Sequence, residues 1–176
     1  MYDFHYNIMK KKYGDDCKLL FTDTDSLCYE VKTGDFYKDI YEDREQYDLS
    51  DVVGEYHDST NKKVVGKMKL EYPDDVITQF IGLRSKMYSI KLNSDKEEKK
   101  AKGVVKSVVE RGLKHEMYDK ILMESGKKFS KMKMIRSIKH RVYTIEMNKI
   151  SLSAYDDKRY LIEEITSLPY GHYKTR

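Results

Sequence analysis

The fold depends most on Leu19–Leu27, which reads LLFTDTDSL. An apolar run ends at Phe21 and an alternating stretch begins near Ser26, so we expect extended chain on both sides of an acidic turn. In a tight hairpin Asp23 and Asp25, two positions apart, can point their carboxylates to the same side. The stretch therefore predicts a β-hairpin that carries two carboxylates near its tip.

The segments around this hairpin suggest helix before it and mixed structure after it. Tyrosines and a methionine recur at helical spacing over Tyr2–Tyr13, and Gly14 stands where a left-handed helix cap is common. The acidic, Tyr-rich stretch Thr33–Thr60 predicts a short helix with irregular connections. Val64–Leu70 predicts another strand.

The middle of the chain contains a further strand with a basic residue. Val76–Ile81 is compatible with helix or strand, whereas Arg84–Ile90 alternates as a strand. That register would place Lys86 and Tyr88 on one face. The following charged stretch, Asn93–Lys102, is a plausible hinge between two units.

After this hinge the apolar spacing becomes helical. Over Val105–Ile121 it is maintained for about five turns, with Gly112 as an interruption and Gly126 as a stop. We therefore expect an α+β chain: an antiparallel sheet portion to about residue 100, then a mainly helical unit over residues 101–176.

Composition indicates a folded, polar protein. The chain has 176 residues, enough for one domain or two small ones. Charged residues make up 36% and apolar residues 39%, and sixteen tyrosines make the chain too aromatic for disorder. The net charge of +4 averages an acidic first half with basic clusters further on, so by itself it argues little for nucleic acid.

Cysteine and histidine do not predict a metal site. Cys17 and Cys28 are the only cysteines, and their spacing fits neither a zinc site nor a disulfide framework. The five histidines are scattered, so any metal should be bound by oxygen. We find no apolar stretch of membrane-spanning length and no leader peptide. We expect an intracellular protein with reduced thiols and no membrane association.

The paired carboxylates have three interpretations. Hard cations such as Mg²⁺ take oxygen ligands and share them with substrate phosphates, so Asp23 and Asp25 can form part of a two-metal phosphoryl-transfer site. The same turn can be a solvated acidic loop, because Asp and Ser hydrogen-bond their own backbone. An Asp-x-Asp turn after an apolar strand can also hold manganese in a nucleotide-sugar glycosyltransferase. The spacing alone does not separate these.

A basic stretch near the C-terminus predicts contact with a phosphate backbone. Lys127–Arg141 contains no acidic residue and interleaves its cations with apolar side chains that we expect to pack inward. A solvated basic face is the alternative. The cations are Lys127, Lys128, Lys131, Lys133, Arg136, Lys139 and Arg141.

Taken as a string, Leu19–Leu27 closely resembles the Asp-Thr-Asp-Ser hairpin of family B DNA polymerases, and the preceding Lys12–Gly14 helix end fits that family. Leu83–Tyr88 resembles its Lys-x-Tyr element, and Lys100–Gly103 resembles the junction where its thumb begins. The matches follow the family's order and, with Ser151–Ser153 and Asp156–Arg159, cover most of the chain. The resemblance is closest to the protein-primed branch, which includes viral, organellar-plasmid and Maverick-type element polymerases.

The resemblance implies a role for each residue of the acidic turn. Asp25 would bridge two catalytic Mg²⁺ ions, with Mn²⁺ as a possible substitute, and Asp23 would be a weaker or auxiliary ligand. Thr24 and Ser26 would shape the turn. The implied activity is templated nucleotidyl transfer from dNTPs in DNA replication.

The resemblance also implies a DNA-binding surface. Residues 1–100 would be the C-terminal part of the polymerase palm, and residues 101–176 the thumb. Lys86 would contact the primer backbone near its 3′ end, with Tyr88 packing against it. Arg84 and Lys102, in the same two elements, are expected to contact DNA, and the basic residues of 127–141 would grip duplex product.

Two motifs of a complete family B polymerase are missing. We find neither the upstream Asp-x-x-Ser-Leu-Tyr-Pro-Ser-like strand that supplies the other metal-binding carboxylate, nor the Lys-and-Asn-Ser-x-Tyr-Gly-like helix that contacts the nucleotide. We therefore expect no primer extension by this chain alone. It would act with the rest of a polymerase chain, with a terminal priming protein as a further candidate partner. Alternatively, it would be a truncated, catalytically dead DNA-binding remnant of a viral or mobile-element gene.

Overall fold

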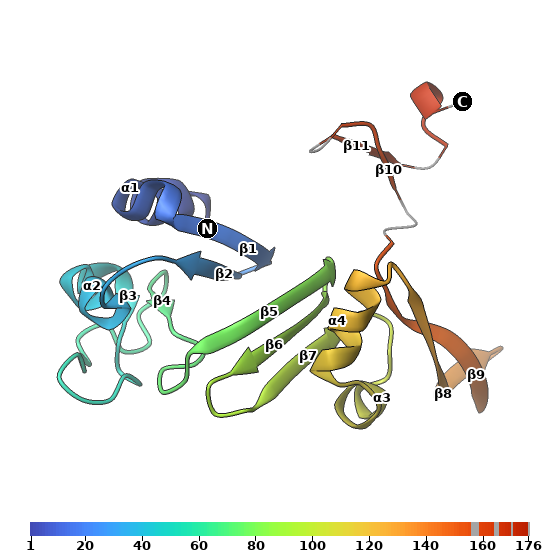
Figure 1. The fold of residues 1–176 in the computed structure, drawn as a ribbon. Coiled ribbons are helices and arrows are strands. Elements are labelled where there is room, and N and C mark those ends of the chain that lie inside the picture. The colour runs from blue at the N-terminus through green and yellow to red at the C-terminus, as the bar shows by residue number, and fades with distance from the viewer. Residues whose placement is uncertain (156–158, 164–165, 170, 176) are drawn as a thin grey trace. The chain divides into compact units, whose positions relative to one another are not determined.

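The computed structural model describes residues 1–155, 159–163, 166–169 and 171–175, and it is a mixed α+β structure (Figure 1). The chain forms two compact units. The N-terminal unit contains Met1–Ile77 with Leu92–Ser94, and the C-terminal unit contains Thr78–Lys91 with Asp95–Arg176. This division does not coincide with the expected boundary near residue 100, which stays a prediction about palm and thumb.

The N-terminal unit begins with the predicted helix. A π-helical segment, η1 (Phe4–Met9), continues into α1 (Lys10–Tyr13) and a 3-10 turn, η2 (Gly14–Asp16). Gly14 has a φ of +55°, which a residue without a Cβ adopts readily. The prediction of a helix that ends at Gly14 is confirmed.

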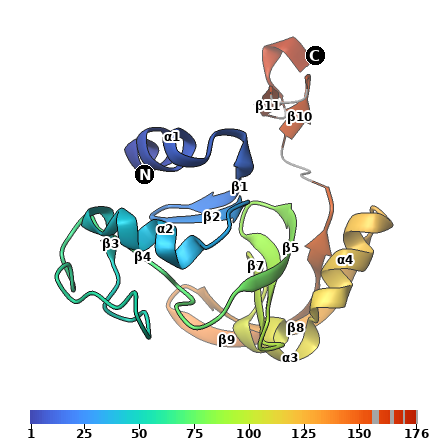
Figure 2. The ribbon, with the colours of Figure 1, turned by 60° about the vertical axis from the view of Figure 1, so that its left-hand side comes forward.

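The predicted hairpin is also confirmed. β1 (Cys17–Asp23) and β2 (Ser26–Val31) pair antiparallel, and Asp23 lies opposite Ser26 at the closed end. Figure 2 shows this hairpin with its two strands side by side. Both cysteines of the hairpin are buried and free, and burial raises the pKa of Cys28 to about 11, so its thiol stays protonated at neutral pH.

The rest of the N-terminal unit is a short helix and a long, ordered loop. α2 (Phe36–Glu42) begins where Asp35 accepts a hydrogen bond from the Lys38 N–H, and the 3-10 turn η3 (Arg44–Gln46) follows. β3 (Tyr47–Asp48) pairs in parallel with β4 (Met68–Lys69). The short helix was predicted correctly.

The strand predicted over Val64–Leu70 is wrong except for its two residues in β4. The reason is local backbone geometry: Gly66 has a φ of +87°, which turns the chain away from an extended path. Ile40, Tyr47, Leu49 and Val52 form the buried apolar core of this unit.

A buried carboxylate fixes the long loop. Asp48 is only 6% exposed and accepts hydrogen bonds from the backbone N–H groups of Ser50 and Lys63, each at 3.0 Å. Lys63 has a φ of +60°, which is unfavourable for a residue with a side chain. Hydrogen bonding by Ser50, followed by that of Lys63, lowers the pKa of Asp48 to about 2.

Replacing Asp48 with alanine should lower the free energy of unfolding by about 2 to 4 kcal/mol, because two backbone donors lose their acceptor. The folded-state pKa lies below the unfolded value, so the stabilisation by Asp48 is present above about pH 4 and is lost as pH falls toward 2. Urea unfolding at several pH values measures both effects. Asp51→Asn, at an exposed residue paired with Lys69, is the control and should change stability little.

The C-terminal unit contains, apart from the end residues Ile77 and Leu92, a three-stranded sheet in the order β5 (Ile77–Arg84), β6 (Met87–Leu92), β7 (Glu97–Ala101). Residues 76–81, for which the sequence was compatible with helix or strand, are mainly extended. Arg84–Ile90 is not one strand, because the chain turns at Ser85–Lys86, where Lys86 has a φ of +57°. Of the proposed hinge over residues 93–102, β7 occupies half and pairs with β6, although one boundary between the two units does fall in this stretch, between Ser94 and Asp95.

The long helix predicted over Val105–Ile121 is two shorter ones, α3 (Lys106–Gly112) and α4 (His115–Met123). Leu113 and Lys114 between them are extended. Leu113 is 1% exposed and joins the core, so burial of this side chain accompanies the break that follows Gly112.

After α4 the described elements are strands except for one short 3-10 turn, so the prediction of a mainly helical C-terminal part is wrong. β8 (Lys127–Ile138) and β9 (Arg141–Ser153) form one long antiparallel hairpin. The run Val142–Ile145 is rich in β-branched and aromatic residues, which favour extended chain. Beyond it lie a short hairpin, β10 (Arg159–Leu161) with β11 (Ser167–Pro169), and the 3-10 turn η4 (Tyr173–Thr175).

The core of the C-terminal unit joins the sheet, both helices and the base of the long hairpin. Met87, Leu113, Tyr118 and Leu152 are among its buried side chains. The Tyr118 hydroxyl donates a hydrogen bond of 3.1 Å to the Lys100 carbonyl, so α4 is tied to β7. Within the described part of the chain, no helix is long and apolar enough to cross a membrane.

A buried polar pair lies at the start of α4. The Ser89 hydroxyl and His115 Nδ1 share a hydrogen bond of 2.8 Å, and these residues are 0% and 5% exposed. The backbone N–H of His115 donates to a Glu97 carboxylate oxygen at 3.2 Å. The histidine therefore joins β6, β7 and α4.

The stability of the protein should fall in mild acid because of His115. Burial lowers the pKa of His115, and Glu97 opposes this only in part. The stabilisation is present above the unfolded pKa of about 6.5 and is lost as pH falls below it, by up to about 1.4 kcal/mol per pH unit. Urea unfolding between pH 7.5 and 5 should show this slope for wild type. His115→Asn should reduce it, whereas His140→Asn, at an exposed turn, should not.

Candidate nucleic-acid interface

The two carboxylates lie at the tip of the β1–β2 hairpin, in different settings. Asp23 is the half-buried last residue of β1, and Asp25 is exposed in the two-residue loop. The Asp25 N–H donates to the Asp23 carbonyl at 2.7 Å, and the Ser26 hydroxyl donates to the same carbonyl at 3.1 Å. Thr24, between them, has a φ of +57°, an unusual conformation for a β-branched residue.

This geometry leaves Asp25 as the carboxylate most open to a ligand. The Thr24 hydroxyl donates a hydrogen bond of 3.3 Å to an Asp23 carboxylate oxygen. Thr24 and Ser26 thus both hydrogen-bond to Asp23 and hold the turn. Among the residues that the structure describes, no group of three or more His, Cys, Asp or Glu side chains is placed to hold a metal ion. The oxygen donors suit Mg²⁺, but they are only part of a ligand set.

Four cations predicted to contact DNA come from three separate segments of the C-terminal unit, and the structure links them in pairs. The Lys102 N–H donates to the Lys86 carbonyl at 3.0 Å, so these residues are neighbours at the end of β6 and β7. Arg84 and Lys127 both contact Tyr155. Arg84 donates a hydrogen bond to the Tyr155 carbonyl, and the Lys127 ammonium lies over the Tyr155 ring. We call Arg84, Lys86, Lys102 and Lys127 the cation cluster.

The structure does not place Lys86 and Tyr88 on one face of a single strand, whereas the packing of Tyr88 against Lys86 stays a prediction. Lys86 is exposed in the turn, whereas Tyr88 lies in β6 and is only 8% exposed. The Tyr88 ring lies 6.1 Å from the Phe80 ring, so it packs within the sheet. Little of the Tyr88 side chain is therefore exposed to solvent.

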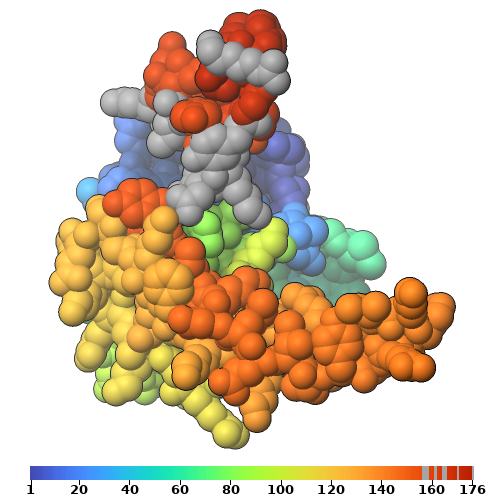
Figure 3. Space-filling view, turned by 90° about the vertical axis from the view of Figure 1, so that its right-hand side faces the viewer, coloured from blue at the N-terminus to red at the C-terminus, as the bar shows by residue number. Residues whose placement is uncertain are grey.

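The long hairpin forms the second basic surface. Lys131, Lys133, Arg136, Lys139 and Arg141 are all exposed, whereas Lys128 is half-buried near the base. Figure 3 shows the β8–β9 hairpin, in orange, extending away from the helices in yellow. We call the part from Lys131 to Asn148 the ribbon.

The expectation that apolar residues of this stretch pack inward is wrong for most of them. Met132 is 3% exposed, but Phe129 is 57%, Ile135 72% and Ile138 60% exposed. A two-stranded hairpin buries side chains only where other elements cover it, and α3 and α4 lie near its base. The outer part of the ribbon therefore presents basic and apolar side chains together.

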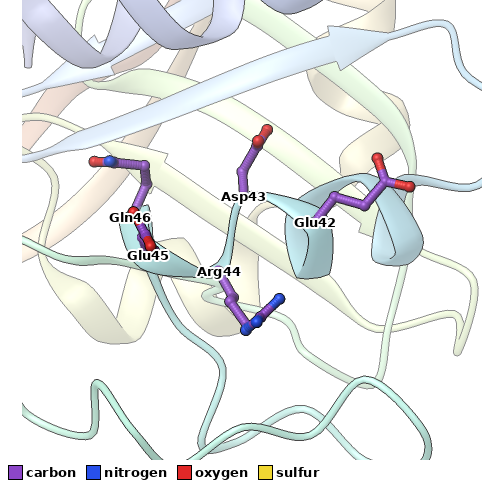
Figure 4. Close-up of a pocket in the computed structure, with 5 residues that line it drawn as sticks. All are labelled: Glu42, Asp43, Arg44, Glu45 and Gln46. Atoms are coloured by element: carbon purple, nitrogen blue, oxygen red, sulfur yellow. The ribbon is translucent and has the colours of Figure 1, made fainter.

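An open hollow elsewhere does not suggest a site. It lies at the turn after α2 and is lined by Glu42, Asp43, Arg44, Glu45 and Gln46. Figure 4 shows the side chains of Asp43 and Arg44 pointing to opposite sides of this turn. Asp43 forms an ion pair with Lys12 at 2.7 Å, so its charge is already balanced.

The predicted residues fall into two groups. Asp23, Asp25 and their turn residues belong to the N-terminal unit, and the basic residues belong to the C-terminal unit. The matched segment at 156–158 lies outside the described residues. Sequence reasoning missed Tyr155, whose one signal was its place between the Ser151–Ser153 and Asp156–Arg159 matches.

Comparison with known proteins gives no family assignment. No family model, no curated protein and no solved structure matches this chain. Evidence for a function therefore comes from the motifs and from the geometry of each unit.

Proposed function

We propose that the chain is part of a DNA-directed DNA polymerase and that its C-terminal unit holds primer-template DNA. The observation that carries the proposal is the cation cluster. The sequence predicted its members as DNA contacts from three separate segments. In the structure Lys86 and Lys102 are hydrogen-bonded neighbours, and Arg84 and Lys127 both contact Tyr155. Three of the four, Lys86, Lys102 and Lys127, are exposed and Arg84 is half-buried, and surface cations bind phosphates without reading sequence.

The ribbon fits the role of a polymerase thumb. Its basic residues are exposed on both faces and at the tip, so a duplex can meet several of them at once. In this proposal residues 1–100 remain the palm portion and residues 101–176 the thumb, with the ribbon in place of the expected helices.

The acidic turn supports the catalytic part of the proposal. Asp25 would be a ligand shared by two Mg²⁺ ions, and Asp23 would be an auxiliary ligand next to it. Bound Mg²⁺ would activate the primer 3′ hydroxyl and stabilise the pyrophosphate that leaves the dNTP. The chain's own contribution is a turn held by Thr24 and Ser26, which fixes where the carboxylates are placed. A further carboxylate must come from another segment.

A DNA-binding remnant without catalysis is the second candidate. The cation cluster and the ribbon lie in one unit and the acidic turn lies in the other, so DNA binding does not require intact carboxylates.

Binding of primer-template DNA by the purified chain, followed by fluorescence anisotropy at increasing salt, tests the proposal. Because cations displace condensed counterions, the logarithm of the association constant should fall linearly with the logarithm of salt concentration. Absence of binding at low salt, or binding of a nucleotide sugar with Mn²⁺ instead, would remove the polymerase and the remnant together.

A further inference from the structure

Tyr155 lies at a turn that leaves the base of the long hairpin. The backbone N–H of Tyr155 donates to the Ser153 hydroxyl at 3.2 Å, and Ser153 is 1% exposed. Ser153 pairs with Lys127 across the β8–β9 ladder. The position of Tyr155 is therefore fixed by a buried residue of the hairpin.

The carbonyl of Tyr155 holds one member of the cation cluster. Arg84 Nη1 donates to it at 3.3 Å, although the two residues are 71 positions apart. This contact joins the end of β5 to the base of the hairpin. It uses only the backbone of Tyr155, so it does not depend on the identity of that side chain.

The ring of Tyr155 holds another member. Lys127 Nζ lies 5.3 Å from the ring centroid, within the range of a cation–π interaction. Tyr155 is 48% exposed and Lys127 is exposed as well, so the pair lies at the surface. A lysine side chain is otherwise flexible, and fixing it before binding reduces the entropy lost on binding.

We propose that Tyr155 is a positioning residue for phosphate binding, which sets Lys127 through its ring and Arg84 through its carbonyl. The inference rests on the proposed function, because it concerns the same cation cluster. It assigns to Tyr155 a task that neither composition nor motif matching indicated, namely that of pre-organising two cations for a phosphate backbone.

Leucine and phenylalanine substitutions of Tyr155, combined with loss of either cation, test the inference. Tyr155→Leu removes the ring and should weaken binding of a primer-template duplex about three- to tenfold, because Lys127 loses its cation–π contact and is less well placed before binding. The slope of the logarithm of the association constant against the logarithm of salt concentration, here called the salt slope, should stay unchanged, because Lys127 still reaches the phosphate. Tyr155→Phe keeps the ring and should bind as wild type does.

The two cations give matched backgrounds for the same substitution. In Lys127→Gln, which should itself lower the salt slope by about one, Tyr155→Leu should have no further effect. In Arg84→Gln the full loss from Tyr155→Leu should remain, because Arg84 binds the carbonyl. Thermal melting of each variant checks that the fold is retained.

Several results would overturn the inference. An undiminished loss from Tyr155→Leu in the Lys127→Gln background would mean that the ring acts directly or only supports the fold. Wild-type affinity in Tyr155→Leu would leave DNA binding intact and remove the inference alone. Absence of duplex binding by wild type would remove the proposed function and the inference with it.

Discussion

Replacing Lys131, Lys133, Arg136 and Lys139 with glutamine should lower affinity for primer-template duplex on the order of 100-fold at low salt. All four residues are exposed on the ribbon. When one of these side chains contacts a phosphate, condensed counterions are released from the DNA. This release supplies most of the affinity that does not depend on sequence.

The salt dependence identifies the cause of such a loss. Every lost phosphate contact lowers the slope of the log–log plot by about 0.9, so the quadruple variant should lose about 3 to 4 units of slope. Anisotropy titrations between low and moderate salt measure affinity and slope together. A lower affinity with an unchanged slope would point to a folding defect instead of lost contacts.

A variant with the same charge change provides the control. Lys106, Arg111, Lys114 and Lys120 are also exposed, belong to α3 and α4 or lie between them, and comprise three lysines and one arginine, as the ribbon set does. Their replacement by glutamine should reduce affinity much less. Equal losses in the two variants would mean that only net charge matters, and the ribbon would then have no particular role.

The local structure around the acidic turn could be predicted because its signals are local. Gly14 ends the helix, and the apolar run to Phe21 with alternation after Ser26 fixes a hairpin of two strands. These features depend on side-chain period and on one glycine, both of which are visible in sequence.

The ribbon could not be predicted because its turn lacks the usual residues. Lys139 and His140 have φ values of +48° and +64°, a pattern that normally favours Asn or Gly in a two-residue hairpin loop. The stretch before it also alternates imperfectly, with cations and apolar residues on both faces. The helical spacing over Val105–Ile121 predicted one long helix for a different reason. The spacing does not show that the chain becomes extended at Leu113, where this side chain is buried in the core between two shorter helices.

The candidate site was predicted as residue types but not as geometry. Lys86 and Lys102 were chosen from motifs, yet their proximity depends on β7 pairing with β6, where a hinge had been expected. The contacts of Tyr155 with Arg84 and Lys127 are tertiary and leave no pattern in the sequence.

In a polypeptide that joins this chain to the missing upstream motifs, Asp25→Asn should reduce primer extension about a thousandfold, taking about 4 kcal/mol for the transition-state stabilisation that depends on this ligand. Asn offers one neutral amide oxygen in place of a carboxylate, which is a poorer ligand for a hard cation. Asp25 lies in the exposed loop of the hairpin, so the substitution should not disturb the ladder between β1 and β2.

The other aspartates of the region separate catalysis from general charge effects. Asp23→Asn should cause a smaller loss, since Asp23 is half-buried and already accepts a hydrogen bond from Thr24. Asp15→Asn, at an exposed residue before β1, should leave extension unchanged. Duplex binding should persist in all three variants, because the cation cluster and the ribbon remain intact. Undiminished extension by Asp25→Asn would exclude this residue as a catalytic ligand and favour the DNA-binding remnant.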